Sequence, residues 1–478
     1  MKEKECLPNA YKLIESMRYM GYSFESAIAD LIDNSITAMA TKINIYMIPY
    51  DDPYIIIHDD GCGMDDEKLS EAMRMGSNPN DLRDENDLGR FGLGLKTASL
   101  SLCRKLIVAS KKNNKLSCYS WDLDYVKEKN KWLTIQYSEE EINKMPMYNE
   151  LMNNIENGTY ILLKNFDRIK STTNDFEKTF NEKIDDTRNH IALVFHRFIQ
   201  EGLNIYINND KIEGRDPFLE NNKATQPKRT EEIKIEDEII TVKPYILPHI
   251  NKLTKEDIEK VGGKEDLKKN QGFYIYRNKR LIIWGTWFRY VRQEELSKLA
   301  RIKVDIPNAL DKIWKIDIKK STASIPDSIK KNLVKSIEDS ILSSKNVYRY
   351  RGRRKSNSEI IYTWDKIKNR DEVIYKINRE LPQYKLLFNS LDNNQKKSLE
   401  LLLREIELNL PIDAIYTEKA EGNKIQETED DFENMIKEFM ESQEKECEKN
   451  GINYEEFIEK FRKTELYKKI NKGEWNGK

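Results

Sequence analysis

Hydrophobic and polar positions follow two different rhythms in the N-terminal part of the chain. Between residues 24 and 40, apolar or small side chains recur every three or four positions behind Ser23, which predicts a helix with an N-terminal cap. Shorter apolar runs predict strands over residues 42–47, 54–58, 105–110, 116–121 and 160–163. Another helix is expected from Lys96. Helices mixed with a largely antiparallel sheet favour an α+β fold, a two-layer α/β sandwich over about residues 1–195.

The pattern changes to short strands over about residues 196–345, where we predict a second α/β domain. The predicted strands are 203–208, 239–246, 272–276 and 280–284, followed by a helix from Pro326. Residues 346–478 combine helical periodicity through Leu408 with a Glu- and Lys-rich end, so we predict a helical, charged C-terminal region with a linker near 417–430.

Composition restricts the possible partners and compartments. The chain has 81 Lys and Arg against 82 Asp and Glu, a net charge of −1, so any surface that attracts nucleic acid must be local. Five cysteines are scattered without a C-x-x-C pair, which favours a reducing cytoplasm over a disulfide or zinc framework. No apolar run reaches the roughly 18 residues of a membrane span, so we expect no membrane association.

The helix over 24–40 carries a first group of candidate residues. Asp30 and Asn34 are four positions apart and therefore share a face of the helix. A carboxylate there could orient a water molecule, and a side-chain carbonyl could hold Mg²⁺. The alternative is that both are solvated polar positions of an amphipathic helix.

A second group follows the strand over 54–58 directly. Gly61 and Gly63 permit a sharp turn and a close approach of the backbone, and a buried Asp59 could accept a hydrogen bond from an exocyclic amine such as that of adenine. A glycine-rich turn without a ligand is the alternative.

The third group is a glycine-rich segment that opens a helix. Residues 89–99 place glycines before an apolar helix, where backbone N–H groups and the positive helix end can hold phosphates, and Lys96 adds a full charge. The segment lacks the spacing of a Walker loop.

These three groups, in this order, resemble the GHKL superfamily, which includes gyrase B subunits, heat-shock chaperone ATPases, MutL, sensor histidine kinases and MORC ATPases. The resemblance implies a Bergerat-type ATP-binding fold in which Asn34 coordinates Mg²⁺ and Asp59, with Gly61, Gly63 and Met64, binds adenine. It also implies a lid that holds the triphosphate, formed by Gly89, Arg90, Phe91, Gly92, Leu93, Gly94, Leu95, Lys96 and Thr97. A fourth motif resembles residues 157–159, where Thr159 would support the adenine-binding aspartate.

The catalytic base departs from the family pattern. The family usually has Glu where this chain has Asp30, and the side chain is shorter by about 1.5 Å. Because general-base geometry tolerates little misplacement, we expect slow turnover. Asp33 is a second candidate base, although we expect it to be a solvated or lid-contacting acid.

The second predicted domain resembles the S5-type transducer domain of MutL, gyrase and MORC relatives. In residues 314–321, Lys319 or Lys320 would reach the γ-phosphate and report the state of the nucleotide, unless the segment is only an exposed basic strand end. The segments 91–99 and 272–280 look most like MORC ATPases and their bacterial relatives. That resemblance covers about residues 1–340 and implies an ATP-dependent homodimer that clamps DNA, with bacterial relatives associated with restriction and anti-phage defence.

The remaining charged segments leave open whether the chain acts on DNA or on a protein. The basic segment 349–355 could neutralise phosphates, or it could be a solvated linker, whereas the acidic run 427–448 would repel DNA. We therefore expect a DNA clamp that works with a companion nuclease or helicase, or alternatively a chaperone- or scaffold-like ATPase with a protein partner. A histidine kinase is disfavoured because none of the four histidines precedes the ATP motifs.

Overall fold

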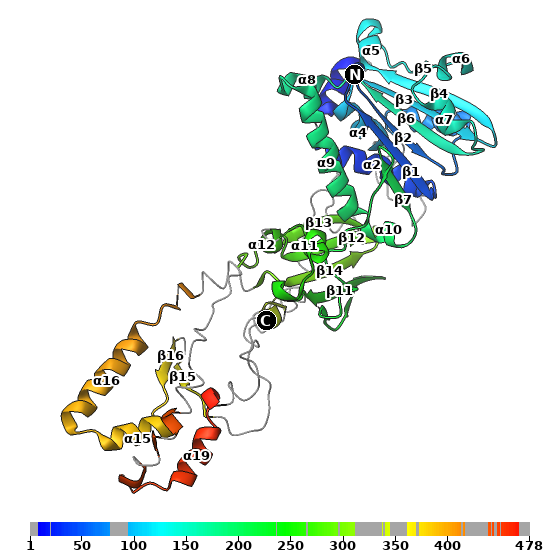
Figure 1. Ribbon diagram of the computed structural model, residues 1–478. Helices are drawn as coiled ribbons and strands as arrows, with labels where there is room; N and C mark the ends of the chain where they lie inside the picture. Colours follow the sequence, from blue (N-terminus) through cyan, green and yellow to red (C-terminus); the bar gives the residue numbers. More distant parts are fainter. Residues whose placement is uncertain are drawn as a thin grey trace, which may run out of the picture. The chain divides into compact units, whose positions relative to one another are not determined.

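The computed structural model (Figure 1) describes most of the chain. The described residues are 8–19, 21–76, 94–235, 237–263, 266–294, 297–310, 337, 340–344, 361–369, 372–412, 414–415, 438–440, 442–443, 447–449 and 451–467. They form two compact units, Met1–Arg351 and Gly352–Lys478.

An eight-stranded sheet organises the first part of unit one. In spatial order its strands are β5 (Ile135–Gln136), β4 (Lys115–Asp122), β3 (Lys105–Lys112), β6 (Gly158–Lys164), β2 (Tyr54–Asp59), β1 (Lys42–Ile48), β7 (Asn204–Ile207) and β8 (Asp210–Lys211). All neighbours are antiparallel except β1 and β7, which are parallel.

Alternation along the strands divides this sheet into two faces. On β2, Ile55 and Ile57 join the core under the larger helices, together with β1 side chains such as Ile43. Ile56 points the other way, into a smaller cluster with Tyr160. Asp59 therefore ends β2 on the face of the larger helices.

The helices around this sheet differ in length and in the face that they cover (Figure 1). The core face packs against α1 (Ala10–Arg18), α2 (Phe24–Thr37), α4 (Gly94–Leu102) and α9 (Phe176–Val194). Short helices α6 (Glu139–Ile142) and α7 (Tyr148–Met152) contribute to the opposite cluster. The remaining helices are α3 (Asp66–Met73), α5 (Leu123–Lys129), α8 (Asp167–Thr172) and α10 (His196–Gln200). The predicted two-layer α/β architecture is confirmed.

A six-stranded sheet forms the second core of unit one. Its path is β10 (Glu231–Ile235), β11 (Glu238–Ile246), β14 (Ala300–Ile306), β12 (Gly272–Arg277) and β13 (Arg280–Thr286), and β9 (Gln226–Pro227) pairs with β11. Helices α11 (Lys255–Lys260) and α12 (Asp266–Lys269) accompany it, with 3-10 turns at Ile250–Lys252 and Asn308–Leu310.

The strand predicted over 203–208 is present as β7, but it belongs to the first sheet. It runs parallel to β1, with Lys42 opposite Asn204, and the Asn208 side chain accepts from Met47 N at 2.8 Å. A parallel neighbour must return through a crossover, which here contains α9 and α10. The apolar pattern of a short strand does not reveal which sheet it joins.

Unit two mixes a hairpin with helices. The hairpin is β15 (Trp364–Asn369) with β16 (Glu372–Ile377), and the helices are α15 (Pro382–Ser390), α16 (Asn393–Leu408) and α19 (Tyr454–Arg462). Leu386, Phe457 and Phe461 form its core with Cys447. The hairpin was not expected in a region predicted to be helical, and the predicted linker near 417–430 lies outside the described residues.

None of the helices in the described part of the chain has both the length and the apolar character that crossing a bilayer requires.

Candidate nucleotide-binding site

Asp59 is held at the end of β2 by donors from two neighbouring segments. Its carboxylate accepts from the Ser35 hydroxyl on α2 at 2.6 Å and from the Gly61 backbone N–H at 3.0 Å. The side chain is 3% exposed. Burial raises the pKa of the Asp59 carboxyl, and the hydrogen bonds from Ser35 and Gly61 oppose this rise. The result is a fixed acceptor in a site of low polarity.

The turn after Asp59 has no room for side chains at its two glycines. A Cβ on Gly61 would lie 2.8 Å from the Ala38 carbonyl oxygen at the end of α2, and Cys62 N donates to that same oxygen at 2.9 Å. Gly63 has φ of +61°, and a Cβ there would lie 1.9 Å from the Lys111 carbonyl oxygen. The turn is thus pressed between α2 and β3, which explains the glycine spacing.

Gly63→Ala is expected to lower the free energy of unfolding by about 2 kcal/mol or more, through a positive φ and a backbone clash. The unfolding temperature should fall by roughly 4 to 8 °C. Gly94→Ala is the matched control because an added Cβ at Gly94 meets nothing within 4 Å. Equal unfolding temperatures for the two variants would contradict the close packing of the turn.

Thr159 lies beside Asp59 on the adjacent strand β6, opposite it in register. Its hydroxyl lies 3.2 Å from Ser110 Oγ, which in turn accepts from Met64 N at 2.8 Å. The hydroxyl that donates to Asp59 is therefore that of Ser35, while Thr159 and Ser110 fix the turn at Met64. Thr159 contributes a backbone hydrogen bond to the Asp59 carboxylate, and its side chain belongs to this neighbouring network.

Asp30 lies on α2 with both carboxylate oxygens near partners. Tyr22 OH donates to Oδ2 at 2.9 Å, and Arg280 Nη2 lies 3.7 Å from Oδ1. Asp30 is 3% exposed, whereas Asn34, one turn later, is exposed. Ser23 caps this helix as predicted, accepting from Ser26 N at 3.3 Å. Asp30 is therefore not the solvated position of the alternative interpretation, whereas Asn34 is exposed.

Asp33 differs from the expectation of a solvated or lid-contacting acid. It is 1% exposed and forms an ion pair with Arg280 of β13, with Nε at 2.7 Å from Oδ2. Arg280 lies 247 positions after Asp33 in the chain. Such a long-range pair has no local sequence signal.

The described part of the lid motif begins α4. Gly94 and Leu95 are partly buried at the helix start, and Lys96 and Thr97 are buried. Lys96 Nζ donates to the Ala72 carbonyl oxygen at the end of α3 at 2.8 Å. Burial lowers the pKa of the Lys96 ammonium to about 8. A nearby phosphate would favour the charged form.

Two groups of predicted residues lie outside the described residues. They are Gly89, Arg90, Phe91, Gly92 and Leu93 of the lid, and Lys319 and Lys320 of the transducer-like segment. The same holds for the basic segment 349–355.

The exposed position of Asn34 suits the chemistry of Mg²⁺. This ion keeps several waters and takes one or two protein oxygens together with phosphate oxygens. A single exposed carbonyl oxygen, beside the buried Asp30, fits that donor set. Asn34 is thus the residue that would hold the ion.

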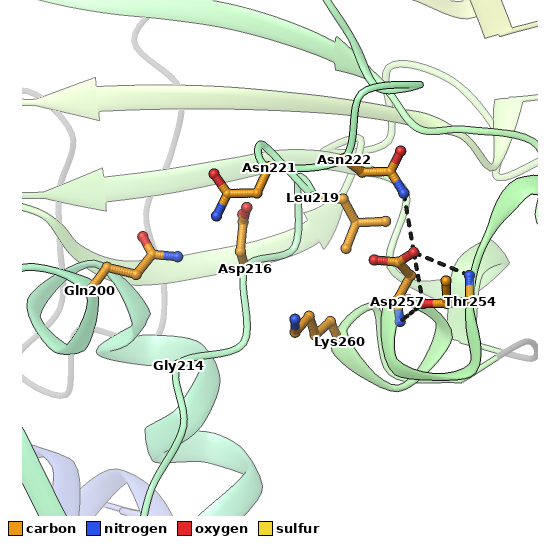
Figure 2. Close-up of a pocket in the computed structure, with 9 residues that line it drawn as sticks. All are labelled: Gln200, Gly214, Asp216, Leu219, Asn221, Asn222, Thr254, Asp257 and Lys260. Carbon is orange, nitrogen blue, oxygen red and sulfur yellow. Dashed lines mark hydrogen bonds between the residues drawn. The ribbon is translucent and has the colours of Figure 1, made fainter.

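A separate cavity of about 390 Å³ lies in unit one near α10 and α11, and Figure 2 shows its polar lining. Asp257 accepts from Thr254 N and from Asn222 Nδ2, both at 3.1 Å. Asp216 accepts from the backbone N–H groups of Phe218 and Glu220 at 2.9 and 2.7 Å. Both carboxylates stabilise local turns, so we assign this cavity no part in nucleotide chemistry.

Sequence reasoning missed four side chains of the site: Tyr22, Ser35, Ser110 and Arg280. Ser35 carried a usable signal, because its position on the apolar face of α2 makes a buried hydroxyl in need of a partner. Arg280 stood inside a segment already quoted for its resemblance, but no role followed from that.

Residues 22–159 match the protein family described as histidine kinase-, DNA gyrase B- and HSP90-like ATPase. ATPase MORC2B of Mus musculus is 33% identical over 96 residues, which are 19% of this chain and 9% of that protein. ATPase MORC2 of Homo sapiens is 30% identical over 96 residues, which are again 19% of this chain and 9% of that protein. ATPase morc-1 of Caenorhabditis elegans is 33% identical over 89 residues, which are 18% of this chain and 10% of that protein.

The match with these relatives is confined to about a tenth of their length. The match with the ATPase family lies in the N-terminal part of the chain, where Asp59 and its glycines lie. The resemblance to GHKL ATPases, with similarity to MORC proteins, is confirmed: residues 22–159 of this chain match the GHKL-type ATPase family.

Proposed function

We propose that this chain is a Mg²⁺-dependent ATPase that works as a molecular switch and forms a homodimer when ATP binds. The observation that carries the proposal is the Asp59 carboxylate, buried and fixed between Ser35 and Gly61 at the end of β2. The carboxylate accepts from Ser35, from Gly61 and from the Thr159 backbone, and lone pairs remain for an exocyclic amine.

Asp30 is the residue that would orient and deprotonate the attacking water. It is ionisable, buried and on the same helix face as Asn34, which would hold Mg²⁺. The shorter Asp in place of Glu supports slow turnover, because the water must lie closer to the helix.

Phosphate binding is proposed for the lid and for the transducer-like segment. Gly89–Thr97 would supply backbone N–H groups at the start of α4, and burial of Lys96 makes an anionic partner favourable. Lys319 or Lys320 would contact the γ-phosphate and so distinguish ATP from ADP.

DNA is the client that we favour. The resemblance to MORC ATPases and the basic segment 349–355 support a clamp, working with a companion nuclease or helicase in bacterial anti-phage defence or restriction. A cytoplasmic setting is supported by the free thiols of the described cysteines Cys62, Cys103, Cys118 and Cys447. The acidic run 427–448 supports the second candidate, a chaperone- or scaffold-like ATPase with a protein client.

Sedimentation tests the switch and separates the two clients. The protein is compared without nucleotide, with ATP and with a non-hydrolysable analogue, and each sample is repeated with linear and with circular DNA. We expect dimers only with nucleotide, retained on circular DNA and lost from the ends of linear DNA.

Nucleotide-dependent dimers that bind neither linear nor circular DNA would support a protein client instead. A monomer in every sample would contradict the proposed switch. Raising the salt concentration from 50 to 200 mM shows whether DNA is bound through its phosphates. A protein with six phosphate contacts loses about 1,000-fold in DNA affinity over this range.

A further inference from the structure

Arg280 begins the second strand of a tight hairpin in the six-stranded sheet. The turn residues Asn278 and Lys279 both have positive φ, +44° and +69°, as a two-residue turn between twisted strands requires. This geometry fixes the start of β13 at Arg280. The hairpin therefore delivers one arginine to a defined place beside α2.

The Arg280 guanidinium is buried against the helix that carries the proposed catalytic base. It is 3% exposed, and its Nε lies 2.8 Å from Asp33 Oδ1 and 2.7 Å from Oδ2. Its Nη2 lies 3.7 Å from Asp30 Oδ1. Nη1 donates to the Leu281 carbonyl oxygen at 3.2 Å, and the guanidinium lies 5.6 Å from the Phe195 ring centroid.

Stability alone does not account for such a group. Burying charges costs desolvation, and a buried ion pair can often be exchanged for apolar side chains without loss of stability. What the pair does supply is a fixed geometry, because a planar guanidinium holds carboxylates in a defined orientation.

The spacing on α2 connects this geometry to the reaction. Asp33 and Asn34 lie three and four positions after Asp30, so each is a neighbour of Asp30 on the surface of the helix. Fixing Asp33 therefore fixes the rotation of that surface, and Asp30 is held on one oxygen by Tyr22 and approached on the other by Arg280. Tyr22 precedes α2 in the chain, whereas Arg280 comes from the second sheet.

We propose that Arg280 is a positioning residue for ATP hydrolysis: it orients Asp30 through the face of α2 and couples the β12–β13 hairpin to the ATP site. The inference rests on the proposed function, since it takes Asp30 as the base. Movement of the hairpin changes the alignment of Asp30, so that turnover depends on the second sheet as well as on bound nucleotide.

Three variants of the full chain test this role. Arg280→Met removes the charge and keeps an unbranched stem. Asp33→Asn combined with Arg280→Met removes both charges of the pair, so that no carboxylate at position 33 remains buried without its cation. Lys279→Met is the matched control, because Lys279 pairs instead with Glu201 Oε2 at 2.7 Å on the surface.

The measurements are kcat and KM for ATP, the Kd of a non-hydrolysable analogue, and the unfolding temperature. We expect kcat to fall about 10- to 100-fold in Arg280→Met, as for small misplacements of a catalytic group, with the Kd changed less than about threefold. The double variant should recover the unfolding temperature but not kcat. Lys279→Met should match the wild type throughout.

Recovery of kcat together with stability in the double variant would overturn the inference, because Arg280 would then only neutralise Asp33. Unchanged kcat in Arg280→Met would overturn it as well. If Arg280→Met fails to fold, the double variant still decides the question. A wild-type protein that does not bind the analogue would instead contradict the proposed function, and this outcome is visible before any variant is compared.

Discussion

Replacing Asp59 with asparagine is expected to weaken ATP binding about 100-fold, the loss of a hydrogen bond to a charged acceptor. Asp59 accepts from Ser35 on one oxygen and from Gly61 on the other. An asparagine can keep its single oxygen toward the Gly61 N–H and turn its NH₂ toward the Ser35 hydroxyl, which can accept. It then loses one acceptor and presents a donor to the adenine amine.

Calorimetric titration with a non-hydrolysable analogue measures this effect, and titration with the guanine analogue measures selectivity. We expect discrimination between adenine and guanine to be lost along with affinity. Asp60→Asn is the control, because Asp60 accepts from the backbone N–H groups of Thr41 and Lys42 at 2.8 and 2.9 Å and holds the start of β1. Full ATP affinity in Asp59→Asn would remove its role in adenine binding.

Asp30→Asn is expected to lower kcat about 1,000-fold, within the range for loss of a general base, while ATP binding persists. An asparagine has nearly the same shape and can still accept from Tyr22 OH, so the fold around α2 should hold. Bound ATP should then accumulate, and with it the dimer.

Single-turnover hydrolysis separates this loss of chemistry from loss of binding. Glu25→Gln is the control, since Glu25 lies in the first turn of the same helix and five positions from Asp30. Turnover at the wild-type rate in Asp30→Asn would assign the base to another residue.

The sequence predicted the part of the site whose causes are local. The helix at α2 follows from its three- and four-residue periodicity, and the end of β2 at Asp59 follows from an apolar run that meets a glycine-rich turn. The close packing of Gly63 against Lys111 was foreseen as a sharp turn with close backbone approach, although its partner was not. Residue type and spacing were sufficient there.

Other parts depend on contacts between distant segments, for which spacing carries no signal. The Arg280–Asp33 pair and the parallel pairing of β7 with β1 are both of this kind. A third kind of miss was local and avoidable. Ser138 and Glu141 form a capping box that opens α6, in a stretch for which we predicted no helix.

The place of β7 in the first sheet decides where this chain can be cut. A fragment that ended at residue 195 would lack β7 and β8, and the backbone groups of β1 that now pair with Asn204–Ile207 would face solvent. Such an unprotected edge strand is a template for pairing with other chains, so the fragment should aggregate. A fragment extended through Lys211 keeps this edge of β1 covered, although only a fragment that also contains Arg280 keeps the cation that pairs with Asp33.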